Sequence, residues 1–179
     1  MGKLKELKGI KGWIKDILIA CLIALVIMIF IKPTIVQQNS MQPTLHPNNY
    51  IFLSRQAYLF SEPRAGDIVV FNSNIPSPTE SRRNKLLIKR VIAVPGDRIT
   101  IAEGKVYVNG VRMEESYIYG NETPGNVNKL IPQGTVFVMG DNRGDSIDSR
   151  SEDVGVVSVS DIVGRAFFRL YPFNMMGRL

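Results

Sequence analysis

A serine in a turn-rich segment is the first residue that could carry chemistry. Ser40 lies within Asn39-Ser40-Met41-Gln42-Pro43-Thr44-Leu45. Such a serine ordinarily caps or hydrogen-bonds a turn, and it needs a base before it can act as a nucleophile. The single histidine, His46, lies six residues further on in a loop, too close in sequence to be the usual partner that converges from elsewhere in the fold. If Ser40 is catalytic, its base therefore comes from another segment.

A lysine inside an apolar stretch is the candidate base. In residues 86–94 (LLIKRVIAV), the alternation of a strand places Lys89 on one face with Leu87 and Val91, and Arg90 on the other face. Burial on such a face disfavours the ammonium and brings the lysine pKa from about 10.4 toward 8, at about 3 kcal/mol of differential destabilisation. The alternative is an edge strand that carries a protective lysine.

The segment Gly140–Arg150 (GDNRGDSIDSR) is dense in turn formers, carboxylates and arginines. It lacks the closing glutamate of a calcium-binding EF-hand loop, and its arginines would neutralise its acids. The pattern favours two charge-assisted pairs, Asp141 with Arg143 and Asp148 with Arg150. These pairs would make the loop rigid and leave Ser146 free to hydrogen-bond a reactive amine. We therefore expect neither a metal ion nor a cofactor.

Four segments, in this order, resemble motifs of bacterial type I signal peptidases: Ser40–Leu45, Gly66–Phe71, Lys89–Asp97 and Gly140–Arg150. The resemblance is spread over most of residues 35–165. It implies a largely antiparallel β fold with a Ser/Lys dyad, in which Ser40 attacks the scissile carbonyl from its si face and Lys89 takes the serine proton. It also implies that Ser146 orients Lys89. Four charged residues would hold the supporting loop: Asp141, Arg143, Asp148 and Arg150.

The same resemblance implies the substrates. Members of that family remove signal peptides from exported preproteins with small residues at positions 1 and 3 before the cut (Ala-x-Ala). Shallow apolar walls near Ser40 would admit Ala and exclude larger side chains, and we expect them to include Val36, Met41, Leu45 and Ile88. Some members carry a hydroxyl residue two positions before the nucleophile as an oxyanion donor, whereas this chain has Gln38 there. The backbone N–H of Ser40 should still donate, and either the Gln38 amide joins it or the backbone alone suffices.

An apolar run near the N-terminus predicts a membrane anchor. Ile17–Ile31 has fifteen apolar residues without a charge, and Trp13 and Ile14 extend it to nineteen, enough to span about 30 Å of hydrocarbon. A cleavable signal would end in small residues and a buried core helix would be amphipathic, but this run ends in Phe30-Ile31-Lys32-Pro33 and is apolar all round. We therefore expect an uncleaved transmembrane anchor at residues 13–31.

Charge around the anchor predicts its orientation. Five lysines precede the apolar run, and Lys32 alone follows it immediately, so the positive-inside rule places the N-terminus in the cytoplasm. Residues 1–12 would form a basic cytoplasmic tail. Residues 32–179 would form the catalytic domain on the extracytoplasmic side of the cell membrane. Ser40 would then lie close to the lipid bilayer, because nine residues extend at most about 30 Å.

The outer part is predicted to be mainly β. Short runs rich in β-branched and aromatic residues predict six strands: Tyr50–Leu53, Asp67–Phe71, Leu86–Val94, Arg98–Ile101, Lys105–Val108 and Thr135–Met139. Glu103-Gly104 and Asn109-Gly110 predict tight hairpin turns. Residues 72–85 and 120–129 are predicted to be solvated loops.

Composition narrows the function. The chain has 179 residues, 45% of them hydrophobic, which suits one domain with an appendage. Half of the net charge of +6 lies in residues 1–16, and the rest forms no basic stripe, so we expect no nucleic-acid partner. Two other functions compete: a soluble self-cleaving Ser/Lys repressor and a catalytically dead, tethered binding module. The anchor and the lack of a DNA-reading helix disfavour the first, and intact Ser40, Lys89 and Ser146 disfavour the second.

Overall fold

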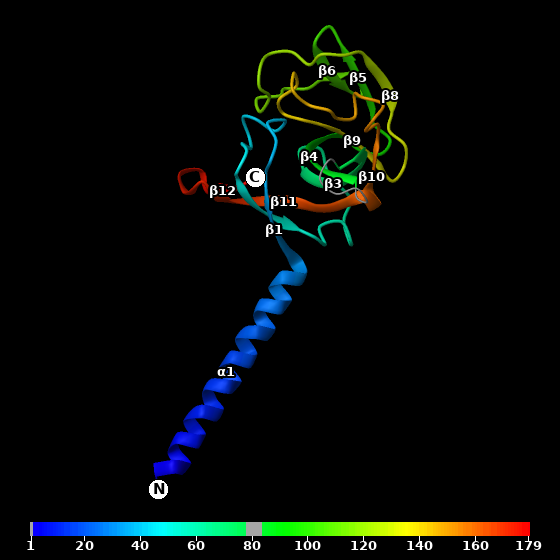
Figure 1. The fold of residues 1–179 in the computed structure, drawn as a ribbon. Helices are drawn as coiled ribbons and strands as arrows, with labels where there is room; N and C mark the ends of the chain where they lie inside the picture. The colour runs from blue at the N-terminus through cyan, green and yellow to red at the C-terminus, as the bar shows by residue number, and fades with distance from the viewer. Residues whose placement is uncertain (1, 78–83) are drawn as a thin grey trace.

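A single long helix precedes the β domain in the computed structural model, which describes residues 2–77 and 84–179. Helix α1 (Gly2–Phe30) extends away from the domain (Figure 1). Its segment Gly12–Phe30 is long and apolar enough to cross a membrane, and none of it is buried against protein. Large apolar side chains such as Trp13 and Leu18 are more than half exposed. The predicted helix is therefore present, and it begins earlier than the predicted anchor because the lysine-rich start is helical too.

The larger sheet of the described residues has eight antiparallel strands, with the order β1-β2-β11-β3-β4-β9-β10 and β12 paired with β11. The strands are β1 (Ile31–Ile35), β2 (Tyr50–Ser54), β3 (Ile68–Pro76), β4 (Asn84–Ala93), β9 (Thr135–Met139), β10 (Val157–Ser158), β11 (Ile162–Tyr171) and β12 (Gly177–Arg178). The 3₁₀ helices η1 (Val159–Asp161) and η2 (Phe173–Met175) flank β11. Strand β1 follows α1 without a linker, so the sheet begins where the helix ends.

A smaller antiparallel sheet lies at the end of the domain opposite α1 (Figure 1). Its four strands within the described residues have the order β7-β6-β5-β8. They are β5 (Arg98–Ala102), β6 (Lys105–Val108), β7 (Val111–Arg112) and β8 (Val127–Leu130). The two predicted hairpin turns are confirmed. Glu103 and Asn109 have φ of 50° and 54°, and the glycines after them have φ of 71° and 80°, as such turns require.

The six predicted strands are all present, and other predictions are corrected. Residues 72–76 and 84–85, predicted to be loop, extend β3 and β4, while residues 78–83 lie outside the described part. Strand β8 occupies part of the loop predicted at residues 120–129. The ten-residue strand β11 was not predicted. Gly164 and three shifts of register interrupt the alternation that marks a strand. One lies between Ile162 and Gly164 against β3, and two lie against β2, between Ala166 and Phe168 and between Arg169 and Tyr171.

Strand β4 contacts all three apolar clusters that form the core of the described residues. Ile88 packs against the first cluster, Leu87 and Val91 belong to the second, and Ile92 and Ala93 belong to the third. A side chain near the middle of this strand is therefore enclosed from several sides. That enclosure is what buries Lys89.

Candidate active site

Ser40 lies in a tightly hydrogen-bonded segment that connects β1 to β2. Val36 anchors the start of this segment, since its N–H donates to Asn49 and its carbonyl accepts from Asn48, at 2.9 and 2.8 Å. The carbonyl of Ser40 accepts from the N–H of Asn142, at 3.0 Å. Ser40 itself is only 5% exposed, and its own N–H has no hydrogen-bond partner among the residues that the structure describes. The segment therefore holds a serine with its backbone donor unused.

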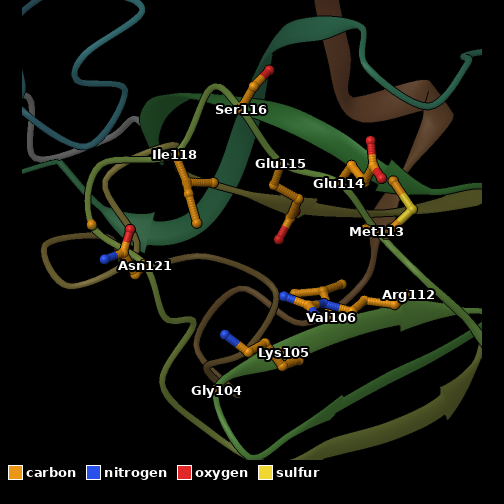
Figure 2. Close-up of a pocket in the computed structure, with 11 residues that line it drawn as sticks. Gly104, Lys105, Val106, Arg112, Met113, Glu114, Glu115, Ser116, Ile118 and Asn121 are labelled. Atoms are coloured by element: carbon orange, nitrogen blue, oxygen red, sulfur yellow. The ribbon is translucent and has the colours of Figure 1, made fainter.

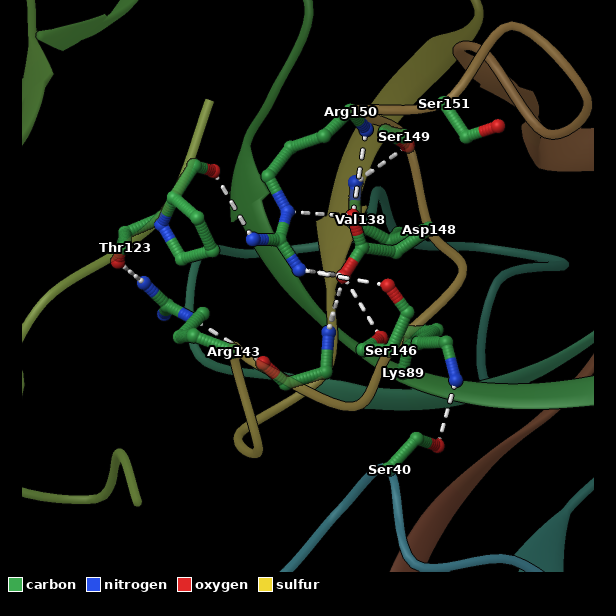
Figure 3. Close-up of polar contacts among 12 residues, drawn as sticks. Ser40, Lys89, Thr123, Val138, Arg143, Ser146, Asp148, Ser149, Arg150 and Ser151 are labelled. Atoms are coloured by element: carbon green, nitrogen blue, oxygen red, sulfur yellow. Dashed lines mark hydrogen bonds and ion pairs between the residues drawn. The ribbon is translucent and has the colours of Figure 1, made fainter. Parts of the chain in front are cut away.

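Lys89 meets Ser40 directly. Lys89 is 1% exposed, and its Nζ donates to Ser40 Oγ at 2.6 Å (Figure 3). Burial lowers the pKa of Lys89 to about 8, against a smaller opposing effect of the Asp148 carboxylate. About a tenth of the lysine is then uncharged at pH 7. An uncharged amine at this distance can take the serine proton, and His46 is exposed in the loop after it.

Asp148 is the centre of a polar network next to this pair (Figure 3). Its Oδ2 accepts from the N–H of Gly140, the hydroxyl of Ser146 and Nη2 of Arg150, at 3.0, 2.7 and 2.9 Å. Its Oδ1 accepts from Nε of Arg150 at 2.8 Å. Burial alone would raise the pKa of Asp148, but Arg150, Gly140 and Ser146 together hold it below its ordinary value. The predicted Asp148–Arg150 pair is present.

Ser146 does not make the contact expected of it. Its hydroxyl has one proton, which goes to the Asp148 carboxylate, and no hydrogen bond joins it to Lys89 within the described part of the chain. Ser146 still lies close to Ser40, because a Cβ placed on Gly140 would overlap both the Ser146 hydroxyl and the Ser40 carbonyl. Glycine at position 140 therefore allows the loop to pack directly against the serine segment.

The predicted Asp141–Arg143 pair is wrong. Asp141 binds Arg90 instead, with Arg90 Nε and Nη2 at 2.8 and 2.6 Å from the two carboxylate oxygens. Arg143 binds Glu115, with distances of 3.0 and 2.6 Å, and also donates to the carbonyl of Gly140. Asp141 and Arg143 are both buried, and each is neutralised by a residue distant in sequence. Their spacing in the loop could not reveal this.

Arg90 and Glu115 are the residues that the sequence reasoning missed. Arg90 donates to Thr44 Oγ1 and to the Gly66 carbonyl, at 3.2 and 3.1 Å, and its guanidinium lies 4.2 Å from the Tyr117 ring centroid. It therefore ties the serine segment to the loop. Arg90 directly follows Lys89 in the segment Lys89–Asp97, and this position could have marked it as a residue of the site. No pattern in the sequence around Glu115 indicated its role. The one available argument was that a buried arginine, here Arg143, requires an acidic partner.

The residues expected to form substrate walls gather in one cluster. Val36, Met41 and Leu45 are at most 2% exposed, and Ile88 packs against them with part of its surface open. Such burial leaves little surface for a large substrate side chain. Gln38 is partly exposed, two residues from Ser40. The role of these five residues toward substrate stays a prediction.

A polar cavity of about 520 Å³ lies apart from the Ser40–Lys89 contact (Figure 2). Its walls come from β6, β7 and the segment after β7, and neither Ser40 nor Lys89 lines it. Glu115 is on its wall, opposite Lys105, and the same carboxylate binds Arg143. The cavity therefore borders the Glu115–Arg143 pair and not the Ser40–Lys89 contact.

Comparisons with known proteins agree with the resemblance. Residues 10–171 match the family model described as signal peptidase, peptidase S26. The chain is 34% identical to signal peptidase I S of Bacillus subtilis, over 94% of this chain and 93% of the relative. It is 35% identical to a signal peptidase I of Leptolyngbya laminosa, over 93% and 82%. A crystal structure of a signal peptidase I from Enterococcus faecalis matches 59% of this chain and 97% of its own, with 29% identity and a TM-score of 0.47. The chain belongs to the signal peptidase I family of peptidases.

Proposed function

We propose that this chain is a membrane-anchored serine endopeptidase that removes N-terminal signal peptides from exported preproteins, with Ser40 as nucleophile and Lys89 as general base. The observation that carries the proposal is the 2.6 Å contact between Lys89 Nζ and Ser40 Oγ. A buried lysine with a lowered pKa can accept a proton, which an ordinary lysine cannot do near neutral pH.

The reaction proceeds in two halves. Uncharged Lys89 takes the Ser40 proton while Oγ attacks the scissile carbonyl carbon, and the resulting ammonium then protonates the leaving amine. Water, deprotonated by Lys89, hydrolyses the ester and restores the serine. The free N–H of Ser40 donates to the negative oxygen of each tetrahedral intermediate, with the Gln38 amide as the candidate second donor.

The supporting loop keeps the base in place. Arg150 keeps Asp148 ionised, and this carboxylate has the largest effect among the groups that raise the pKa of Lys89. It therefore opposes the effect of burial and limits the fall of the lysine pKa. Ser146 influences the pKa of Lys89 indirectly, because its hydroxyl donates to Asp148 and helps to keep that carboxylate ionised. Asp141 and Arg143 fix the two ends of this arrangement to Arg90 and Glu115, which are not the partners expected for them.

Specificity follows from the packing beside Ser40. A closely packed apolar wall accepts a methyl group with little rearrangement but would have to open for a leucine or phenylalanine. The wall consists of Val36, Met41, Leu45 and Ile88. We therefore assign cleavage after Ala-x-Ala and similar sequences.

The anchor places the enzyme at its substrate. Residues 13–31 span the membrane, residues 1–12 stay in the cytoplasm, and residues 32–179 lie on the extracytoplasmic side. Because β1 continues directly from α1, Ser40 cannot be far from the bilayer, in which an exported preprotein is held by its own apolar signal. The lipid bilayer and the preprotein are thus the partners, and neither nucleic acid nor metal is one.

A cleavage assay with the purified full chain in detergent tests the proposal. Wild type, Ser40→Ala and the matched control Ser160→Ala, at an exposed serine, are each incubated with a preprotein. We expect wild type and the control to cut after a small residue, as read by mass spectrometry of the product, and Ser40→Ala to leave the preprotein intact. Cleavage by folded Ser40→Ala at the wild-type rate would contradict the assignment.

A further inference from the structure

Thr44 is held by arginines from two different strands. It lies four residues after Ser40 in the serine segment, which connects β1 to β2. Arg90 of β4 donates to its hydroxyl at 3.2 Å, and Arg169 of β11 donates from Nη1 to its carbonyl at 2.7 Å. The shorter bond comes from a residue 125 positions further along the chain. Strand β11 therefore contacts the serine segment through the side chain of Arg169.

Arg169 is itself fixed in place. Its backbone pairs with Ile51 of β2 and with Gly177 of β12. Nε of its partly buried side chain donates to the carbonyl of Met175 at 2.7 Å. The guanidinium is planar and rigid, so bonds from two of its nitrogens to carbonyls of two different segments define its position. Arg169 thus bridges the turn between β11 and β12 and the serine segment.

The contacts of Arg169 differ from those of the other arginines of the site. Arg90, Arg143 and Arg150 each bind a carboxylate. Within the described part of the chain, Arg169 forms no ion pair, and both of its hydrogen-bond acceptors are backbone carbonyls. Its charge strengthens these two bonds. Arg169 is not among the groups that shift the pKa of Lys89, so it acts on the position of the main chain and not on the charge of the base.

Contacts within the serine segment link the position of Thr44 to that of Ser40. The N–H of Leu45 donates to the carbonyl of Met41 at 2.8 Å, and both side chains are completely buried. Leu45 directly follows Thr44, and Met41 directly follows Ser40, so a shift at one end of this turn moves the other end. The contact between Ser40 Oγ and Lys89 Nζ is 2.6 Å long, and a misplacement of about 1 Å lowers a catalytic rate by roughly a hundredfold. The geometry of the dyad therefore depends on how firmly Thr44 is held.

We propose that Arg169 is a positioning residue for the nucleophile: by holding the Thr44 carbonyl, it keeps Ser40 Oγ within reach of Lys89 Nζ. This inference rests on the proposed function and extends it to a residue of β11, outside the four motif segments. Arg169 bonds to neither the nucleophile nor the base, so it takes no proton and forms no bond in the reaction. Its loss should leave the base intact and lower the rate at which serine and base act together.

The cleavage kinetics of three full-length variants test this role. Arg169→Met removes both bonds, Arg169→Lys keeps a charged donor, and Arg178→Met is the matched control at an exposed arginine of β12. On a preprotein we expect kcat to fall roughly thirtyfold for Arg169→Met and about threefold for Arg169→Lys, and to stay unchanged for the control. The apparent pKa of kcat/KM should stay at its wild-type value in all three, because the surroundings of Lys89 are unaltered.

Two results would overturn the positioning role. One is a wild-type kcat for folded Arg169→Met, with folding checked by far-UV circular dichroism. The other is a loss of activity that comes with a changed apparent pKa, which would assign an electrostatic role to Arg169. If Arg169→Met does not fold, Arg169→Lys decides: a threefold loss at an unchanged apparent pKa supports the proposal, and a wild-type kcat overturns it.

A double variant tests whether the effect passes through Thr44. Thr44→Val removes the bond from Arg90 and keeps the carbonyl that Arg169 binds. If both arginines hold the same residue, the double variant Thr44→Val/Arg169→Met should lose about threefold more of kcat than the product of the two single losses. A loss equal to that product would show independent effects and overturn the assignment to Thr44.

Amide hydrogen exchange tests the same hold without cleavage. In Arg169→Met we expect the hydrogen-bonded N–H groups of Gln42 and Leu45 to exchange roughly tenfold faster than in wild type, while the small sheet and Arg178→Met show wild-type exchange. Equal exchange of these two groups in Arg169→Met and wild type overturns the proposal. If wild type itself fails to cut a preprotein, the proposed function fails, and the exchange rates still decide whether Arg169 holds the serine segment.

Discussion

Replacing Lys89 with methionine is expected to stabilise the folded chain at neutral pH while abolishing cleavage. The lysine is 1% exposed and its pKa is lowered from 10.5 to about 8, mainly by burial. At 1.36 kcal/mol per pKa unit, the buried ammonium costs roughly 3 kcal/mol at pH 7 relative to the unfolded chain. Methionine has a similar shape and no charge. Losing the hydrogen bond to Ser40 offsets about 1 kcal/mol, so we expect a net gain of roughly 2 kcal/mol.

The pH dependence of this gain identifies its cause. Between pH 8 and 10.5 the unfolded chain still binds the lysine proton and the folded chain has released it, so wild-type stability rises with pH across this window. Methionine does not titrate. The advantage of Lys89→Met should therefore be full below pH 8 and should largely disappear by about pH 10.

Urea unfolding of the full chain in detergent, followed by far-UV circular dichroism at pH 7 and pH 10, measures the effect. Lys129→Met, at an exposed lysine on β8, is the matched control and should show no pH-dependent gain. A Lys89→Met chain that is less stable than wild type at pH 7, or whose gain is the same at both pH values, would refute the claim that a buried charge is being removed.

Five further outcomes are expected. Lys89→Arg keeps the charge but cannot be deprotonated, so turnover should fall by several orders of magnitude, and a folded variant that retains a tenth of wild-type cleavage would rule out the dyad. The kcat/KM of wild type should rise with pH up to an apparent pKa of about 8, whereas a flat profile from pH 6 to 9 would contradict a lysine base. Gly140→Ala should destabilise the fold by roughly 1–3 kcal/mol and impair cleavage because its Cβ overlaps Ser40 and Ser146, while Gly144→Ala, which has open space, should do neither. Cleavage should survive EDTA, and a requirement for a divalent ion would overturn the assignment of a metal-free site. Protease added to spheroplasts should digest residues 32–179, and digestion of the first dozen residues alone would overturn the proposed orientation.

Local pattern was sufficient for the parts of the site that depend on neighbours in sequence. The alternation around Lys89 predicted its buried face, and the Asp148–Arg150 pair formed between residues two apart. The hairpin at Asn109-Gly110 followed from the positive φ that these residues tolerate. In each case the decisive interaction lies within one strand, turn or loop.

Tertiary pairing decided the rest. Asp141 and Arg143 are also two residues apart, yet each binds a residue from another segment, Arg90 and Glu115, because the fold brings these buried groups closer. Strand β11 escaped prediction for a related reason. Its Gly164 is needed where a Cβ would meet the Ser54 carbonyl at 2.8 Å, a constraint set by a strand more than a hundred residues earlier. Such requirements are invisible to periodicity.

The position of β11 also determines when the protease can become active. Strands β1 and β2, which flank Ser40, come from the start of the domain, and β3 and β4, of which β4 carries Lys89, follow them. The strand that joins β2 to β3 is β11, made of residues 162–171 near the end of the chain. Pairing over such a sequence separation is late in folding. Synthesis must therefore be nearly complete before the sheet unites the two halves of the proposed dyad, and under the proposed topology a chain still crossing the membrane carries no assembled protease.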